Sequence, residues 1–369
     1  MIKKNSIESL AIKILIGVFS FPFTSMNALA SEHEFSYFSD TTGSTDIAAL
    51  RAVLIDDLKQ ASYASGGFVN HRWGFTYNIN DNWTFILAER AGGTVDTNSN
   101  TVESYYFISK KKNISQQPLD VFLKYELLHA KGFGLSYNQS INDVSFKFDL
   151  YHWNVQEFRD SFASGNVRGT NKGSIRGTVD FVEYYSDRNF LKRPKREGAW
   201  QNNGKGLSLD VYISYDITED VNAYLEAKDI LSSIKFNNLG HTFGKISSDN
   251  SFIDSNGNLA FLPVLSGKET KSDLNYKIPQ FTKIGLTWDM NALWQIGTEI
   301  NYNDILPLYQ FGVTHPIGSH RVGFWLNPRY KMPSFHWAYD KWKINFGMDN
   351  LNTNKAKNFY LAVQAPFSF

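Results

Sequence analysis

The chain has 369 residues, nearly equal numbers of basic and acidic side chains, and a formal net charge of +1. It contains no cysteine, which excludes disulfides, thiolate metal sites and a lipid-modified N-terminal cysteine. The near-neutral charge argues against nucleic-acid binding, whereas 15% aromatic and only 20% charged residues suit a membrane β-barrel or a large secreted β-sandwich.

Residues 1–30 have the layout of a secretory signal peptide. Two lysines near the start are followed by an apolar run from Ile14 to Phe23 and by the small-residue site Ala28-Leu29-Ala30. The run is too short for a membrane helix, which needs about 20 apolar residues. We therefore expect this segment to be removed when the chain is exported.

Residues 31–66 are predicted to form an N-terminal segment with one amphipathic helix between Thr45 and Tyr63. Apolar residues such as Ile47 and Leu54 recur there at three- and four-residue spacing, and glycines end the pattern. Two placements remain open: a helix packed at a barrel mouth on the periplasmic side, or a plug folded into the lumen.

From Phe68 onward the hydrophobic period changes to two, which predicts β-strands. The short turns are expected at Asn80–Asn82, Asn142-Asp143, Glu219-Asp220, Asp289–Asn291 and around Gly318. The longer polar segments, read as loops, are 93–103, 159–172, 187–203 and 236–280. The count is about 14 strands, within a range of about 12 to 16. Simple up-and-down order does not place every short turn at one end, so either the stretch 167–185 holds two strands or one turn is an outer loop.

The last residues, Phe359 to Phe369, alternate strictly and end on an aromatic residue. This ending resembles the closing strand of Gram-negative outer-membrane β-barrel (porin-like) proteins, whose terminal Phe belongs to the assembly signal; here Phe367 and Phe369 match it. The resemblance implies an all-β, transmembrane antiparallel β-barrel over residues 67–369 in the bacterial cell outer membrane, with apolar faces toward lipid and polar faces toward an aqueous lumen.

Charged side chains on the polar strand faces are the candidates for a selective lumen lining. They are Arg72, Arg90, Lys124, Lys147, Arg176, Arg321, Arg329, Asp149, Glu226 and Glu299. A mixed field of both signs across a pore selects solutes by charge and size. The alternative is that these groups form lumen salt bridges that keep the interior ordered.

A basic loop lies between two of the predicted strands. Its cations are Arg188, Lys192, Arg193, Lys195 and Arg196. On an outer surface they would pair with anionic lipopolysaccharide headgroups or attract acidic sugars. The expected partners are therefore outer-membrane lipid and lipopolysaccharide, the barrel-assembly machinery and a small hydrophilic solute, with a homo-oligomer as an open alternative.

The leading functional expectation is a porin for passive diffusion of ions and small hydrophilic solutes, with a preference for anionic or acidic saccharides. The alternatives are a barrel that exports a secreted polysaccharide and a non-conducting structural or adhesive barrel. An enzyme is not expected, because the sequence has neither a G-x-S-x-G elbow nor an H-E-x-x-H pair and its histidines do not cluster. No catalytic residue, metal site or cofactor is expected.

Overall fold

The computed structural model describes residues 34–48, 65–110, 114–170, 175–187, 203–248, 251–253, 259–261, 264–303, 306–352 and 354–368. Three predicted features lie outside these residues: the signal peptide, the basic loop from Arg188 to Arg196, and Phe369 of the assembly signal. Most of the predicted helix from Thr45 to Tyr63 also lies outside them.

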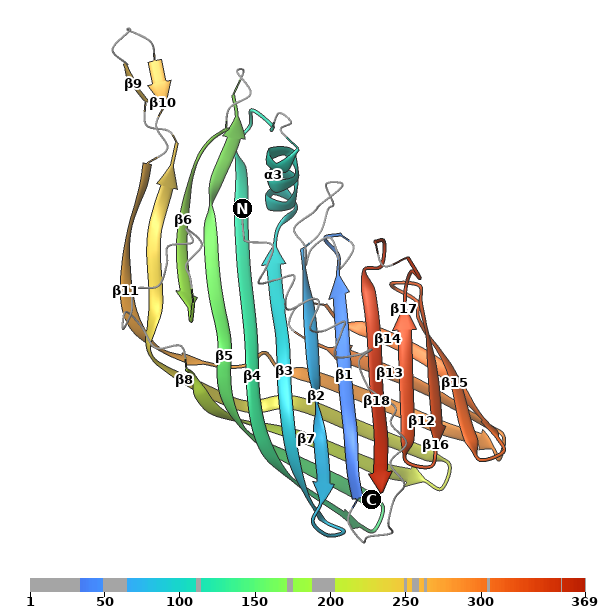
Figure 1. Cartoon of the computed structure of the whole chain (residues 1–369). Coiled ribbons are helices and arrows are strands. Elements are labelled where there is room, and N and C mark those ends of the chain that lie inside the picture. The colour runs from blue at the N-terminus through green and yellow to red at the C-terminus, as the bar shows by residue number, and fades with distance from the viewer. Residues whose placement is uncertain are drawn as a thin grey trace.

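The described strands close into one antiparallel barrel (Figure 1). The strands of the wall are β1 (Glu34–Thr45), β2 (Gly66–Asn78), β3 (Trp83–Thr97), β4 (Leu119–Ile141), β5 (Val144–Gly169), β6 (Ile175–Tyr185), β7 (Lys205–Thr218), β8 (Val221–Ser247), β11 (Val264–Tyr276), β12 (Phe281–Asn291), β13 (Trp294–Tyr302), β14 (Leu308–Ile317), β15 (His320–Asn327), β16 (Met332–Tyr339), β17 (Trp342–Met348) and β18 (Asn358–Ser368). A separate hairpin is formed by β9 (Ser251–Ile253) and β10 (Leu259–Phe261), and a helix, α3 (Ser99–Ser109), follows β3. Among the described residues, no helix has the length and apolar composition needed to cross a bilayer.

Two positions of the wall are each shared by two strands. β6 pairs with the C-terminal half of β5, and β7 pairs with its N-terminal half. In the same way, β11 pairs with the C-terminal half of β8 and β12 with its N-terminal half. The 16 strands of the sheet therefore fill 14 positions, which confirms the predicted number.

The split positions also explain why the short turns were hard to place from the sequence. The stretch 167–185 does hold two strands, the end of β5 and all of β6, and β7 then continues in the direction of β6. The predicted turns consequently all lie at one end, where the chain also ends (Figure 1). Short turns mark the periplasmic end of an outer-membrane barrel, so the opposite end faces outward.

The barrel begins earlier in the chain than the predicted boundary at residue 67. β1 lies within the segment that we expected to precede the barrel, and it closes the ring by pairing with β18, with Phe35 opposite Phe367. The residues between β1 and β2, where the helix was predicted, therefore connect two wall strands at the outer end.

The outer face of the wall carries a continuous apolar band. Its exposed side chains include Phe75, Leu87, Phe133, Leu150, Leu207, Ile284, Ile300, Phe311, Phe324 and Phe346. Large apolar side chains exposed on every side of a closed sheet are suited to lipid, because a closed barrel leaves no backbone group unpaired in the hydrocarbon. The alternation read from the sequence is confirmed, and the chain is an outer-membrane β-barrel.

Part of the wall rises beyond this band at the outer end (Figure 1). We call it the outer arm: residues 119–130 of β4, 155–169 of β5, all of β6, 234–247 of β8, and β11. Because β4, β5 and β8 run without a break from the periplasmic turns into the arm, the inner face of the arm continues the inner face of the barrel.

Inside the barrel, the indole of Trp325 lies flat over Gly297, and an added Cβ at that glycine would overlap the ring. Gly297→Ala is therefore expected to lower the free energy of unfolding by about 1–3 kcal/mol through overpacking, as measured by urea unfolding in lipid vesicles. In a Trp325→Ala background the same substitution should cost little further, because the ring is gone. Equal costs in both backgrounds would contradict the ring contact.

Candidate functional site

One side of the inner face of the barrel is apolar and packed, while buried polar side chains such as Glu299, Gln310 and Ser334 line the other side. One cluster of buried side chains, which we call the lumen core, comprises Ile86, Ala88, Leu128, Ala130, Tyr151, Trp153, Val155, Phe158, Ile234, Phe236, Leu239, Tyr276 and Ile278. They come from β3, β4, β5, β8, β11 and the segment directly after β11. Trp153 and Ile234 are 0% exposed, so water has no access to this part of the lumen.

A second apolar cluster lies near the outer mouth. Phe68 of β2 packs with Leu306 and Leu308, at the start of β14, and partly buried Phe281 and Tyr330 cover them. Because β2 and β14 are far apart around the ring, this cluster joins nearly opposite walls and narrows the mouth on that side.

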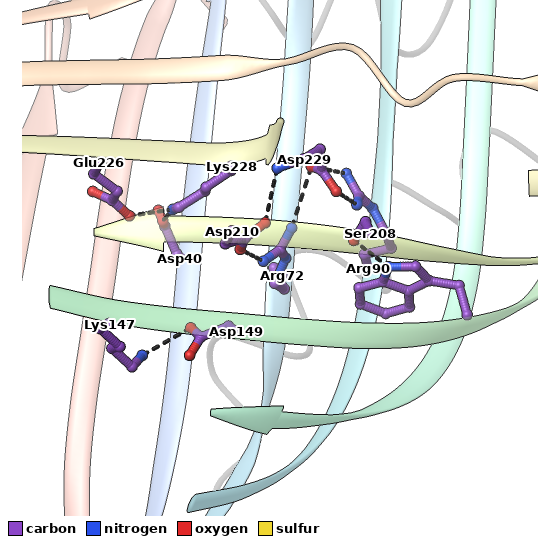
Figure 2. Close-up of polar contacts among 11 residues, drawn as sticks. Asp40, Arg72, Arg90, Lys147, Asp149, Ser208, Asp210, Glu226, Lys228 and Asp229 are labelled. Carbon is purple, nitrogen blue, oxygen red and sulfur yellow. Dashed lines mark hydrogen bonds and ion pairs between the residues drawn. The ribbon is translucent and has the colours of Figure 1, made fainter. Parts of the chain in front are cut away.

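Ion pairs cross the lumen from β2 and β3 to β7 and β8 (Figure 2). Arg72 pairs with Asp210 and, at 3.3 Å, with Asp229, while Arg90 binds Asp229 at 2.7 Å. The backbone N–H of Asp229 donates to Asp210 at 2.8 Å. Asp229 has a left-handed backbone with φ of 58° and lies where the register between β7 and β8 shifts, and this bulge turns its carboxylate inward.

The Trp153 ring connects the ion pairs to the lumen core. Its indole N–H donates to Ser208 Oγ at 2.8 Å, and the guanidinium carbons of Arg90 and Arg72 lie 5.3 and 5.7 Å from its centroid. Tyr151 stacks beside it at 5.1 Å. The two cations are thus held between carboxylates and aromatic faces, which compensates for their loss of water.

A second charged group lies beside the first. Lys228 pairs with Asp40 across the lumen and with Glu226 at 3.2 Å (Figure 2). Lys283 lies 3.5 Å from Glu226 and 3.8 Å from Glu299. The cavity next to them measures about 30 Å³, which is the space of about one water molecule.

The structure brings only some of the predicted lumen residues together. Arg72, Arg90, Glu226 and Glu299 belong to the two charged groups. The others are dispersed. Three of them form ion pairs elsewhere: Lys147 with Asp149 at 2.8 Å near the periplasmic end, Lys124 with Glu126 at 2.6 Å in the outer arm, and Arg329 with Asp46 at 3.8 Å in an outer turn. Arg176 lies at the start of β6, and Arg321 is exposed beside the β14–β15 turn.

Sequence reasoning missed Asp40, Asp229 and Trp153 as parts of this centre. Asp229 follows Lys228 directly, and two neighbouring charged residues interrupt an otherwise regular alternation. This interruption was the available signal of a bulge.

The outer arm carries an apolar groove of about 500 Å³ on its inner face. Phe162, Val182, Phe243 and Lys268 are consecutive cross-strand partners on four neighbouring strands and form one row of its lining. The neighbouring row contains Asp180 and Lys245. Apolar side chains thus form the middle of the groove, with charged groups at its rim.

An aromatic series leads from the groove toward the lumen core. The ring centroids of Phe243 and His241 are 5.4 Å apart, and His241 stacks on Tyr184 at 4.4 Å with nearly parallel planes. Tyr184 in turn packs against the lumen core. Burial lowers the pKa of His241, so the imidazole is neutral at pH 7 and the series carries no charge there.

No family model and no curated protein matches the chain. Solved structures with a similar arrangement include a deletion mutant of TodX, titled a monoaromatic hydrocarbon channel, at 13% identity over 96% of this chain and 93% of that chain with a TM-score of 0.43. They also include the hydrocarbon channel CymD, at 8% identity over 92% and 89% with a TM-score of 0.42, and a Pseudomonas aeruginosa FadL homologue, at 9% identity over 90% and 87% with a TM-score of 0.36.

The resemblance to outer-membrane β-barrels is confirmed, but the expected function is wrong. A porin for ions and hydrophilic solutes needs a wet lumen, whereas the described lumen is filled on one side by a packed apolar cluster, narrowed at the mouth by a second one and crossed by ion pairs. A polysaccharide exporter would need the same wet lumen, and a purely structural or adhesive barrel does not account for a groove that leads onto the lumen core.

Proposed function

We propose that this outer-membrane protein transfers small apolar molecules inward from the cell surface. The observation that carries the proposal is the series of aromatic contacts that connects the groove of the outer arm to the lumen core. An apolar molecule gains free energy by leaving water for such a surface, at about 25 cal/mol per Å². A hydrated solute would instead lose its hydrogen bonds there.

The groove is the entry site in this proposal. Three of its apolar residues, Phe162, Val182 and Phe243, are each 37–43% exposed and offer a surface that a ligand can cover. Lys268 at the rim favours cargo with one anionic group on an apolar body, since a cation beside an apolar surface binds both parts of such a molecule, whereas Lys245 lies opposite Asp180.

Movement beyond the groove takes place by exchange of contacts within the lumen core. Phe158 lies 4.5 Å from Phe236 and 4.8 Å from Tyr276 by ring centroid, so a ligand passes by displacing rings rather than by following water. The cross-lumen ion pairs keep this region closed to water and ions when no ligand is present.

The test is uptake by vesicles that contain the full chain. Radiolabelled toluene and a medium-chain fatty acid should enter, while swelling with glucose should stay at the level of empty vesicles. Phe243→Asp, which places a carboxylate in the groove, should slow uptake about tenfold, because desolvating that charge opposes binding.

Ile246→Asp is the matched control. Ile246 lies on the same strand but on the opposite face, and it is exposed to a similar extent, 37% against 42% for Phe243. Equal uptake by the two variants would refute the groove as the entry site. Glucose swelling at porin rates would refute the proposed function itself.

A further inference from the structure

A row of basic side chains crosses the outer surface of the wall just above the apolar band. Lys131 of β4 lies opposite Asn154 of β5, which lies opposite Lys205 of β7, which lies opposite Lys235 of β8. Directly opposed residues on neighbouring strands point to the same face, so the three lysines form one continuous strip. We call it the basic row.

The basic row marks the upper edge of the lipid-facing surface. Phe133 of β4 and Leu207 of β7 each lie two positions closer to the periplasmic turns than the lysine of the same strand, and each is 51% exposed. Leu231 of β8 lies four positions closer to those turns than Lys235 and is 67% exposed. A spanning strand takes about 9–11 residues, and the outward positions below the row are mostly apolar, with His152 and Ser233 directly beneath the row as polar exceptions. The row therefore lies at headgroup depth, at the end of the barrel that faces outward.

The lysines are available to an external anion. Lys205 and Lys235 are exposed, and the side chain of Lys131 is 60% exposed. Lys131 lies 3.7 Å from Glu89, but that carboxylate also bonds to His129 at 2.6 Å. Asn154, exposed between the lysines, adds an amide that can donate a hydrogen bond.

We propose that the basic row and the apolar side chains below it bind lipopolysaccharide through the phosphates of its acylated disaccharide. Lys205 and Lys235 lie on adjacent strands, about 4.8 Å apart, so both ammonium groups reach one phosphate. Lys131, two strands farther along, is placed for a second phosphate, while Phe133, Leu207 and Leu231 contact the acyl chains. The proposal does not depend on what the barrel transports.

Binding to the purified full chain in detergent tests the site. The probe is a bis-phosphorylated lipid A, titrated by native mass spectrometry, and the variant Lys205→Gln/Lys235→Gln should bind it about tenfold more weakly. Lys205→Arg/Lys235→Arg, which keeps both charges, should bind like the original chain. Heat-dependent mobility in gels verifies that each variant is folded.

Lys331→Gln/Lys355→Gln is the matched control, since it removes the same charge from exposed lysines in other outer turns and should leave binding unchanged. Equal loss in both double variants would mean that only net charge matters and would overturn the proposal. It would also be overturned if dephosphorylated lipid A bound as tightly, or if phosphatidylglycerol bound the original chain as tightly and lost affinity in the same variant.

Discussion

Asp229→Asn should lower the free energy of unfolding by about 3–5 kcal/mol, the cost of leaving buried charges without their partner. Asp229 is 4% exposed and is shared by Arg72 and Arg90, so one substitution leaves two guanidinium groups under-compensated. Asparagine accepts the left-handed backbone at φ of 58°, which confines the change to the charge. Urea unfolding in lipid vesicles measures the effect.

Asp220→Asn provides the comparison, because Asp220 lies exposed in the β7–β8 turn. Its loss should change the unfolding free energy by less than about 0.5 kcal/mol. If the two substitutions cost the same, the ion pairs across the lumen do not hold β2 and β3 against β8.

Trp153→Ala should have a similarly large effect on stability and a second effect on permeability. The ring is fully buried, lies near both Arg72 and Arg90, and donates to Ser208. Truncation of a buried tryptophan costs about 3–5 kcal/mol. It also leaves a space beside charged groups, which water will enter, so planar bilayers with the variant should conduct ions where the original chain does not.

Trp288→Ala serves as the control for tryptophan loss. Trp288 is 46% exposed on the lipid-facing surface of β12, so its removal opens no space in the lumen and bilayers should stay non-conducting. A Trp153→Ala barrel that stays sealed would show that the indole is not what excludes water from the charged layer.

The architecture was predictable because side-chain period and turn chemistry act locally. β13 and β18 alternate so strictly that their outward faces can be read from the sequence, and turns such as Asn142-Asp143 identify the hairpins. The split positions were not predictable, since nothing local shows that β6 and β7 pair with two halves of one strand. The helix α3 was read as loop although Asn98 caps it by accepting from the Thr101 N–H at 2.9 Å, because its apolar spacing is weak.

The character of the lumen was the larger error, and its cause is also physical. Alternation separates two faces of a strand but does not tell how far apart opposite walls lie, which decides whether inward side chains meet water or one another. Phe236 and Trp153 occupy inward positions that would be wet in a wide barrel. The meeting of Arg90 with Asp229 depends on a bulge and on a separation of 139 residues, beyond any spacing rule.

The two split positions have a consequence for how the chain can change. The lower parts of β5 and β8, joined by β7 and bordered by β12, already complete the hydrogen-bonded circuit within the membrane. The outer arm is therefore an addition to a self-sufficient ring, inserted where β6 gives way to β7 and β11 to β12. Evolution can lengthen, shorten or replace this accessory part, and with it the surface presented outside the membrane, while the membrane-embedded cylinder keeps its circumference and its order of strands.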